Sequence, residues 1–319
     1  MDKIISNKLN IIRIISMIMI VLCHYLQFYG NKLAFWFNVG VQIFFILSGV
    51  LYGCKEVKDY KKFWKNKFFK LYLPYVIVVI LFFIFNLIFH VGEMGFMDLF
   101  YYLTATQAFT HNVEPIAHLW FMSYIFLFYL LIPVLEKFDF SKDKYFYIKL
   151  ILIIIGLQFL QFTNVINVNI TYLALFMIGY YFSRRKFKHN IKTDNYKLLC
   201  GLSGLVCLVG IPLQLYLETL NLEGILLKFF TIYHDYIHGF LGITLIIIML
   251  KILPSIKNKV TEYLSNISFH IYLIHQIFIL GVFTLLNIKF GLPLSILVIF
   301  LLSNVLYFIS NFINKYINK

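Results

Sequence analysis

Residues 13–24 read RIISMIMIVLCH, an apolar run that begins with an arginine and ends with a histidine. The ten residues between Arg13 and His24 are apolar or small, which is typical of a helix surrounded by lipid. A helix that only had to dissolve in a bilayer would carry neither ionisable residue, because each is costly there. The stretch therefore predicts a membrane-spanning helix whose two ionisable residues need an explanation.

The composition of the whole chain agrees with this interpretation. Of 319 residues, 61% are hydrophobic and only 13% are charged, whereas a soluble domain has roughly a quarter charged residues. No small-x-small cleavage site follows the first apolar run, so we expect an uncleaved first span rather than a signal peptide. The four cysteines form no C-x-x-C pair and lie in or beside apolar runs. The predicted fold class is an all-α integral membrane protein.

Ten segments are apolar enough to cross a bilayer, which requires about 20 residues each. We expect the spans at 9–28, 34–54, 71–90, 118–136, 146–163, 168–183, 197–217, 231–250, 264–286 and 293–313. No internal repeat, linker or separate soluble domain is apparent. We therefore expect residues 1–319 to form one transmembrane domain with no appended soluble domain.

The basic residues fall mainly on one side of these spans. Of 28 Lys and Arg residues, 24 lie in the N-terminal segment, the loops 55–70, 137–149, 184–197 and 251–259, and the C-terminal tail. The 91–117 loop has neither Lys nor Arg. The positive-inside rule then places both termini in the cytoplasm. Basic loops beside anionic membrane lipid also account for the net charge of +14 without a nucleic-acid partner.

Arg13 and His24 lie on nearly the same face of the first span. Eleven residues make about three helical turns, which separates the two side chains by roughly 16 Å along the axis. Arg13 alone fits a snorkelling residue, and His24 alone fits a hydrogen-bonded packing residue. Sharing one face favours a functional pair that lines a passage through the membrane.

Two further segments each allow a structural and a functional interpretation. GVQIFFILSG, residues 40–49, contains Ser48 beside Gly49 and reads first as a helix-packing motif. KKFWKNKFFKLYLPY, residues 61–75, alternates lysines with aromatic residues. It is either a juxtamembrane anchor or a cytoplasmic cradle for a polyanionic, nucleotide-like ligand.

Three further short stretches place polar residues within or at the ends of spans. HLWFM opens the fourth span at His118 and Trp120, and ISFHIYLIH, residues 267–275, places polar residues at helical spacing. The latter residues are Ser268, Tyr272 and His275. YHDYIHG, residues 233–239, has two histidines at i, i+4 beside an aspartate, but no further metal ligands, so we predict no metal site there.

Taken in order, these segments resemble acyltransferase family 3, the integral membrane O-acyltransferases of surface polysaccharides. The resemblance covers nearly the whole chain and rests on the R-x10-H pair, FFILSG, KFFKLYLPY, HLWF with a later proline, and S-x-x-x-Y followed by a histidine. Where the family usually has two arginines three apart, this chain has Lys67 and Lys70. Where many members have an acidic pair after the HLWFMS segment, it has Ile125 and Phe126.

The resemblance implies a multi-pass protein of the bacterial cell membrane that moves an acyl group, most often acetyl, from cytoplasmic acyl-CoA to a sugar hydroxyl outside. The acceptor is a surface polysaccharide or its lipid-linked precursor, and no cofactor is permanently bound. Arg13, Lys67, Lys70 and Ser48 would bind the donor. His24, assisted by Arg13, would be the general base, because neutral imidazole is suited to accept a proton near pH 7.

For the acceptor, the resemblance implies contacts from five residues: His118, Trp120, Ser268, Tyr272 and His275. Direct transfer is favoured over a covalent acyl-enzyme. Cys23 lies about 100° around the helix from His24, and neither Ser48 nor Ser268 stands in a recognisable nucleophile elbow. The alternative function is a polysaccharide or glycolipid exporter or flippase, which would be expected to show repeats or paired broken helices.

Overall fold

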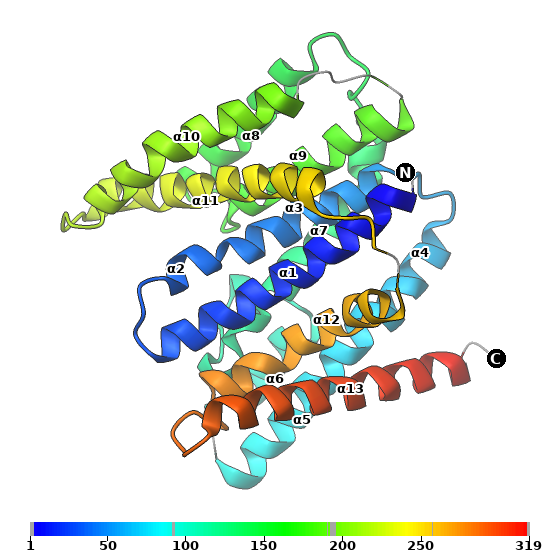
Figure 1. The fold of residues 1–319 in the computed structure, drawn as a ribbon, viewed down its shortest axis with the longest axis vertical. Helices are drawn as coiled ribbons and strands as arrows, with labels where there is room; N and C mark the ends of the chain where they lie inside the picture. The colour runs from blue at the N-terminus through cyan, green and yellow to red at the C-terminus, as the bar shows by residue number, and fades with distance from the viewer. Residues whose placement is uncertain (1–2, 91–92, 190, 192–195, 257, 318–319) are drawn as a thin grey trace. The chain divides into compact units, whose positions relative to one another are not determined.

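The computed structural model of the chain describes residues 3–90, 93–189, 191, 196–256 and 258–317. Within these residues every regular element is helical (Figure 1). The main helices are α1 (Lys3–Phe28), α2 (Ala34–Phe37), α3 (Val39–Gly53), α4 (Tyr60–Lys67), α5 (Leu73–Phe89), α6 (Phe96–Leu103), α7 (Trp120–Lys137), α8 (Phe146–Phe162), α9 (Ile170–Ser183), α10 (Tyr196–Leu217), α11 (Gly224–Ile252), α12 (Lys259–Ile279) and α13 (Gly291–Ile317).

Four short helical turns complete the described elements. Two are π-helices, η1 (Phe68–Tyr72) and η4 (Arg184–Lys188), and two are 3-10 helices, η2 (Gln107–Phe109) and η3 (Glu114–Leu119). Each π-helix continues directly from a longer helix in a basic part of the sequence. The extra residue of a π-turn redirects the side chains that follow it, and such turns are frequent at functional sites.

Seven helical segments of the described chain are long and apolar enough to cross a membrane. They are Lys3–Phe28, Ala34–Gly53, Tyr60–Phe89, Glu114–Lys137, Leu199–Leu217, Gly224–Ile252 and Gly291–Tyr316. Helices α8, α9 and α12 cover the other three predicted spans, but α8 and α9 have only 17 and 14 residues. An all-helical fold with several spans is thus confirmed, whereas the count of ten and the cytoplasmic termini stay predictions.

The chain forms two compact units, each assembled from separate segments. The first unit contains residues 1–16, 38–56 and 130–258, and the second contains residues 17–37, 57–129 and 259–319. Parts of the predicted loops 91–117, 184–197 and 251–259, and Lys319, lie outside the described residues.

The first unit is built around the close contact of α3 with α9, and α11 packs against both. Glycines make this contact possible, because a Cβ added to Gly49 would lie only 2.1 Å from the carbonyl oxygen of Phe176. A Cβ on Gly179 would likewise lie 2.3 Å from the carbonyl oxygen of Ile46. The packing interpretation of the GVQIFFILSG segment is therefore confirmed for Gly49.

In the second unit, α12 contacts η3, α5 and α13, and α5 also contacts α6. Hydrogen bonds of two tyrosine hydroxyls join α5 to α6 and α6 to the segment before η3. Tyr75 donates to the carbonyl oxygen of Tyr102, and the Tyr102 hydroxyl accepts a hydrogen bond from the backbone of Val113 at 3.0 Å. η3, which contains His118, lies against the C-terminal half of α12.

Candidate functional site: a cluster of buried imidazoles

Three histidines from three different elements meet in the second unit. His24 comes from the C-terminal half of α1, His118 from η3 and His275 from α12. The ring centroids of His24 and His275 are 4.9 Å apart, and those of His118 and His275 are 5.0 Å apart, both in edge-to-face arrangements. His275 is fully buried and His118 is 5% exposed. We call these three residues the imidazole cluster.

Backbone hydrogen bonds define where two of the rings carry their protons. His275 Nδ1 lies 2.7 Å from the carbonyl oxygen of Tyr272, and His118 Nε2 lies 3.2 Å from that of Leu273. A carbonyl oxygen only accepts hydrogen bonds, so each of these nitrogens is the N–H donor. In the neutral rings, His275 Nε2 and His118 Nδ1 therefore carry lone pairs that can accept a proton.

One nitrogen of each ring in this cluster is buried and makes no hydrogen bond to the described residues. His275 Nε2, His118 Nδ1 and His24 Nδ1 have no hydrogen-bond partner among the residues that the structure describes. Most buried polar atoms in proteins are hydrogen-bonded, and each exception calls for an explanation. A ligand with hydroxyl groups would supply the missing partners, and a neutral imidazole could also accept the hydroxyl proton.

The other predicted acceptor-binding residues differ in how they relate to the cluster. Tyr272 packs edge-on against His118 with 5.5 Å between ring centroids, and its hydroxyl donates to the carbonyl oxygen of His118. Ser268 lies on the same helix but donates to the carbonyl oxygen of Ser265 at 2.8 Å. Trp120 makes edge-to-face ring contacts with Phe121 and Tyr124.

Two residues of this site were not predicted from the sequence. The Phe121 ring packs against Tyr272 with 5.3 Å between centroids. Gln276 donates to the carbonyl oxygen of Glu114 at 3.4 Å, which fastens the start of η3 to α12. Gln276 directly follows His275, so an amide next to a predicted site residue was the available signal.

Of the residues predicted to bind the donor, two lie in the second unit. Lys67 ends α4, and its ammonium lies 4.4 Å from the ring centroid of Tyr129 and 5.5 Å from that of Phe63. Lys70 is exposed within the π-helix η1. The other two, Arg13 on α1 and Ser48 on α3, are partly buried in the first unit.

The YHDYIHG segment forms a separate polar cluster in the first unit. The rings of His234 and His238 are 4.5 Å apart, and His234 Nδ1 lies 3.2 Å from the carboxylate of Asp235. Asn169 donates to the same carboxylate at 2.6 Å. Within the described part of the chain, no group of three His, Cys, Asp or Glu side chains is placed to hold a metal ion.

Comparison with known proteins gives one result. A family model described as an acyltransferase domain matches residues 6–312, almost the full length of the chain. The comparisons found no match among curated proteins or solved structures.

Proposed function

Because the chain belongs to acyltransferase family 3, we propose that it transfers an acetyl group from acyl-CoA to a sugar hydroxyl of a surface polysaccharide or its lipid-linked precursor. The family makes it an acyltransferase, and its apolar helices make it a multi-pass membrane protein. The single observation that supports a transferase site is the imidazole cluster, with three buried ring nitrogens that have no partner among the described residues. The proposed location is the bacterial cell membrane.

In the proposed reaction His24 acts as the general base. Its ring accepts the proton of the sugar hydroxyl while the hydroxyl oxygen attacks the thioester carbonyl carbon. The carbon–sulfur bond then breaks, and the CoA thiolate leaves with the proton that His24 took up. A positioned base of this kind contributes about 10²–10⁴ in rate. The sugar oxygen forms the new ester in this single step, so no covalent acyl-enzyme is needed.

His275 and His118 are proposed to orient the acceptor sugar beside His24. Their lone-pair nitrogens can accept hydrogen bonds from neighbouring sugar hydroxyls, and their N–H groups are held by α12 carbonyl oxygens. Tyr272 supports His118 through its ring and its hydroxyl. Ser268 and Trp120 are proposed to complete the acceptor wall around this centre.

The donor is proposed to bind through its phosphates and its flat adenine ring. Lys67 and Lys70 lie in a segment with exposed aromatic residues, which suits a ligand that combines phosphates with a base. Arg13 and Ser48 are proposed to contact the pantetheine arm. Arg13 lies on α1, eleven residues before His24 in the sequence.

An in-cell experiment separates this proposal from an exporter or flippase. His24→Gln keeps a polar side chain but cannot take a proton at neutral pH, so surface glycan should lose nearly all alkali-labile acetate while total polymer stays normal. The matched control is His270→Gln, a buried histidine on α12 whose ring packs on Tyr307 instead. Loss of polymer with unchanged acetate per sugar would support the exporter, and normal acetate would remove His24 from catalysis.

A further inference from the structure

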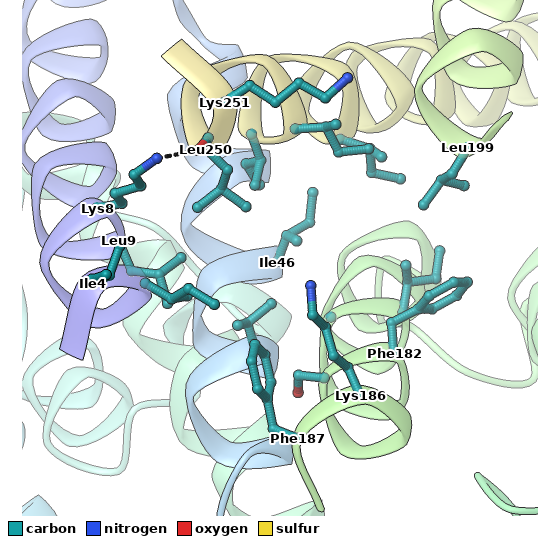
Figure 2. Close-up of a pocket in the computed structure, with 18 residues that line it drawn as sticks. Ile4, Lys8, Leu9, Ile46, Phe182, Lys186, Phe187, Leu199, Leu250 and Lys251 are labelled. Carbon is teal, nitrogen blue, oxygen red and sulfur yellow. Dashed lines mark hydrogen bonds between the residues drawn. The ribbon is translucent and has the colours of Figure 1, made fainter. Parts of the chain in front are cut away.

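The first unit contains a cavity of about 380 Å³ that the proposed reaction does not use (Figure 2). Ligand pockets usually measure about 300–1,000 Å³, so this cavity is large enough for part of a small molecule. Thirteen of its 18 lining residues are apolar, and they come from α1, α3, α9, α10 and α11 with η4. Such walls favour a hydrocarbon chain.

Three lysines line the same cavity: Lys8, Lys186 and Lys251. None of the 18 described lining residues is Asp or Glu, so the walls themselves supply no carboxylate. Figure 2 shows the Lys186 ammonium directed into the cavity and Lys251 lying along its α11 edge. A ligand with a negative group would be attracted to this concentration of lysines.

A hydrogen bond to the protein backbone fixes the position of the Lys8 ammonium group. Its ammonium donates to the carbonyl oxygen of Leu250 at 2.7 Å, one of the last carbonyls of α11. This bond holds the charge at the cavity instead of extending it into water, as a snorkelling lysine would. The ammonium of Lys186 lies 5.5 Å from the ring centroid of Phe187, which also lines the cavity.

The cavity lies at one end of the helices that form it. It is bounded by the start of α1, the end of α9 with η4, and the end of α11. The basic segments of the sequence adjoin these same helix ends, so the positive-inside rule assigns them to the cytoplasmic leaflet. Basic pockets between spans on that side suit anionic lipid headgroups.

We propose that this cavity binds an anionic phospholipid, with one acyl chain between the apolar walls and the phosphate among Lys8, Lys186 and Lys251. A lipid combines the two features that the cavity offers, an apolar chain and a negative headgroup. A zwitterionic lipid would match the walls but carries no net negative charge to attract it to the three lysines. The site uses other residues than the proposed donor and acceptor sites and does not depend on the acyltransferase reaction.

The test is native mass spectrometry of the purified full-length protein, titrated with phosphatidylglycerol or with phosphatidylcholine of identical chains. We expect one phosphatidylglycerol to bind more tightly than phosphatidylcholine. The triple variant Lys8→Gln/Lys186→Gln/Lys251→Gln should lose affinity for phosphatidylglycerol on the order of a hundredfold, since each lysine near anionic lipid contributes roughly a factor of five. Its affinity for phosphatidylcholine should not change.

Two matched controls separate the cavity from general charge and packing effects. Lys142→Gln/Lys144→Gln/Lys315→Gln removes three exposed charges elsewhere and should leave lipid affinity unchanged. Val50→Phe fills the cavity without altering charge and should weaken both lipids, whereas Leu205→Phe, on an exposed face of α10, should weaken neither.

Three results would overturn the proposal. Equal binding of the two lipids by the wild type would remove the selectivity for anionic headgroups. Equal losses in the two triple lysine variants would remove the role of the cavity lysines. Displacement of bound phosphatidylglycerol by inorganic phosphate alone would show that the three lysines bind free phosphate and not a lipid headgroup. Thermal unfolding of each variant, measured in the same detergent, identifies those that fail to fold. If the triple lysine variant does not fold, the lipid affinity of Val50→Phe decides the test.

Discussion

His275 lies between His24 and His118, and the carbonyl oxygen of Tyr272 determines which of its nitrogens carries the proton. The helical spacing of Tyr272 and His275 predicted that they share a face of one helix. Their proximity to His118 could not be predicted from spacing, because 154 residues separate Tyr272 from His118. The orientation of Ser268 was also beyond sequence reasoning, since a buried serine can satisfy its hydroxyl on its own helix, as this one does.

A second residue-scale feature is the buried Arg184 of η4, which sequence reasoning counted only as one of the basic loop residues. Arg184 is 1% exposed, and its Nε lies 2.5 Å from the carboxylate of Asp139. Partial burial raises the pKa of Asp139, but hydrogen bonds from Arg184 and Ser141 outweigh this effect and lower the pKa to about 2. The folded protein therefore favours the ionised carboxylate.

We predict that Asp139→Asn destabilises the protein in a pH-dependent way. Removing one partner of a buried ion pair costs about 3 kcal/mol, the lower end of the usual range, because Glu136 still lies 3.6 Å from Arg184. A carboxyl whose pKa falls on folding stabilises the protein above its ordinary pKa, and this stabilisation is lost as the pH falls through about 2. Thermal unfolding from pH 7 to pH 2 should show the gap between wild type and variant closing below about pH 4. A constant gap would contradict the assignment.

At the scale of elements, the apolar pattern located the helices well but their ends poorly. The predicted span 34–54 corresponds to the candidate span Ala34–Gly53, within which a one-residue turn at Asn38 separates α2 from α3. The predicted span 264–286 ends earlier, at Ile279, since the apolar residues after it form a turn region that reaches Phe290 with a φ of 63°. Apolar loops cannot be told from helix by composition alone. The π-helices η1 and η4 have no counterpart in an apolar period and were not predicted.

The contact between α3 and α9 gives an element-scale prediction. Gly49→Ala would place a Cβ 2.1 Å from the Phe176 carbonyl oxygen, so the two helices must separate, at a cost of about 1–3 kcal/mol. Gly204→Ala in α10 is the matched control, because nothing lies within 4 Å of its Cβ position. In a helix interior this control should be neutral or stabilising by about 0.5–1 kcal/mol. Equal thermal stability of Gly49→Ala and wild type would refute close packing at this position.

At the scale of the whole molecule, composition established the class and the charge distribution predicted the topology. Single-cysteine labelling tests that topology in a background where Cys23, Cys54, Cys200 and Cys207 are replaced by serine. Cysteines introduced at the exposed positions Lys58 and Asn112 should differ in their labelling from outside the cell. A membrane-impermeant maleimide added to intact cells should label position 112 only. Labelling of position 58 but not 112 would reverse the topology and place His24 in the compartment of the donor.

The most direct test of the central claim is the rate at which purified protein transfers label from radiolabelled acetyl-CoA to the isolated glycan. His24→Gln should lower kcat by about 10²–10⁴ while the KM for acetyl-CoA stays near the wild-type value, because the base acts in the transition state. Lys67→Ala/Lys70→Ala should instead raise that KM, and His270→Gln should behave as wild type. A kcat for His24→Gln within a factor of two of the wild type would contradict the account.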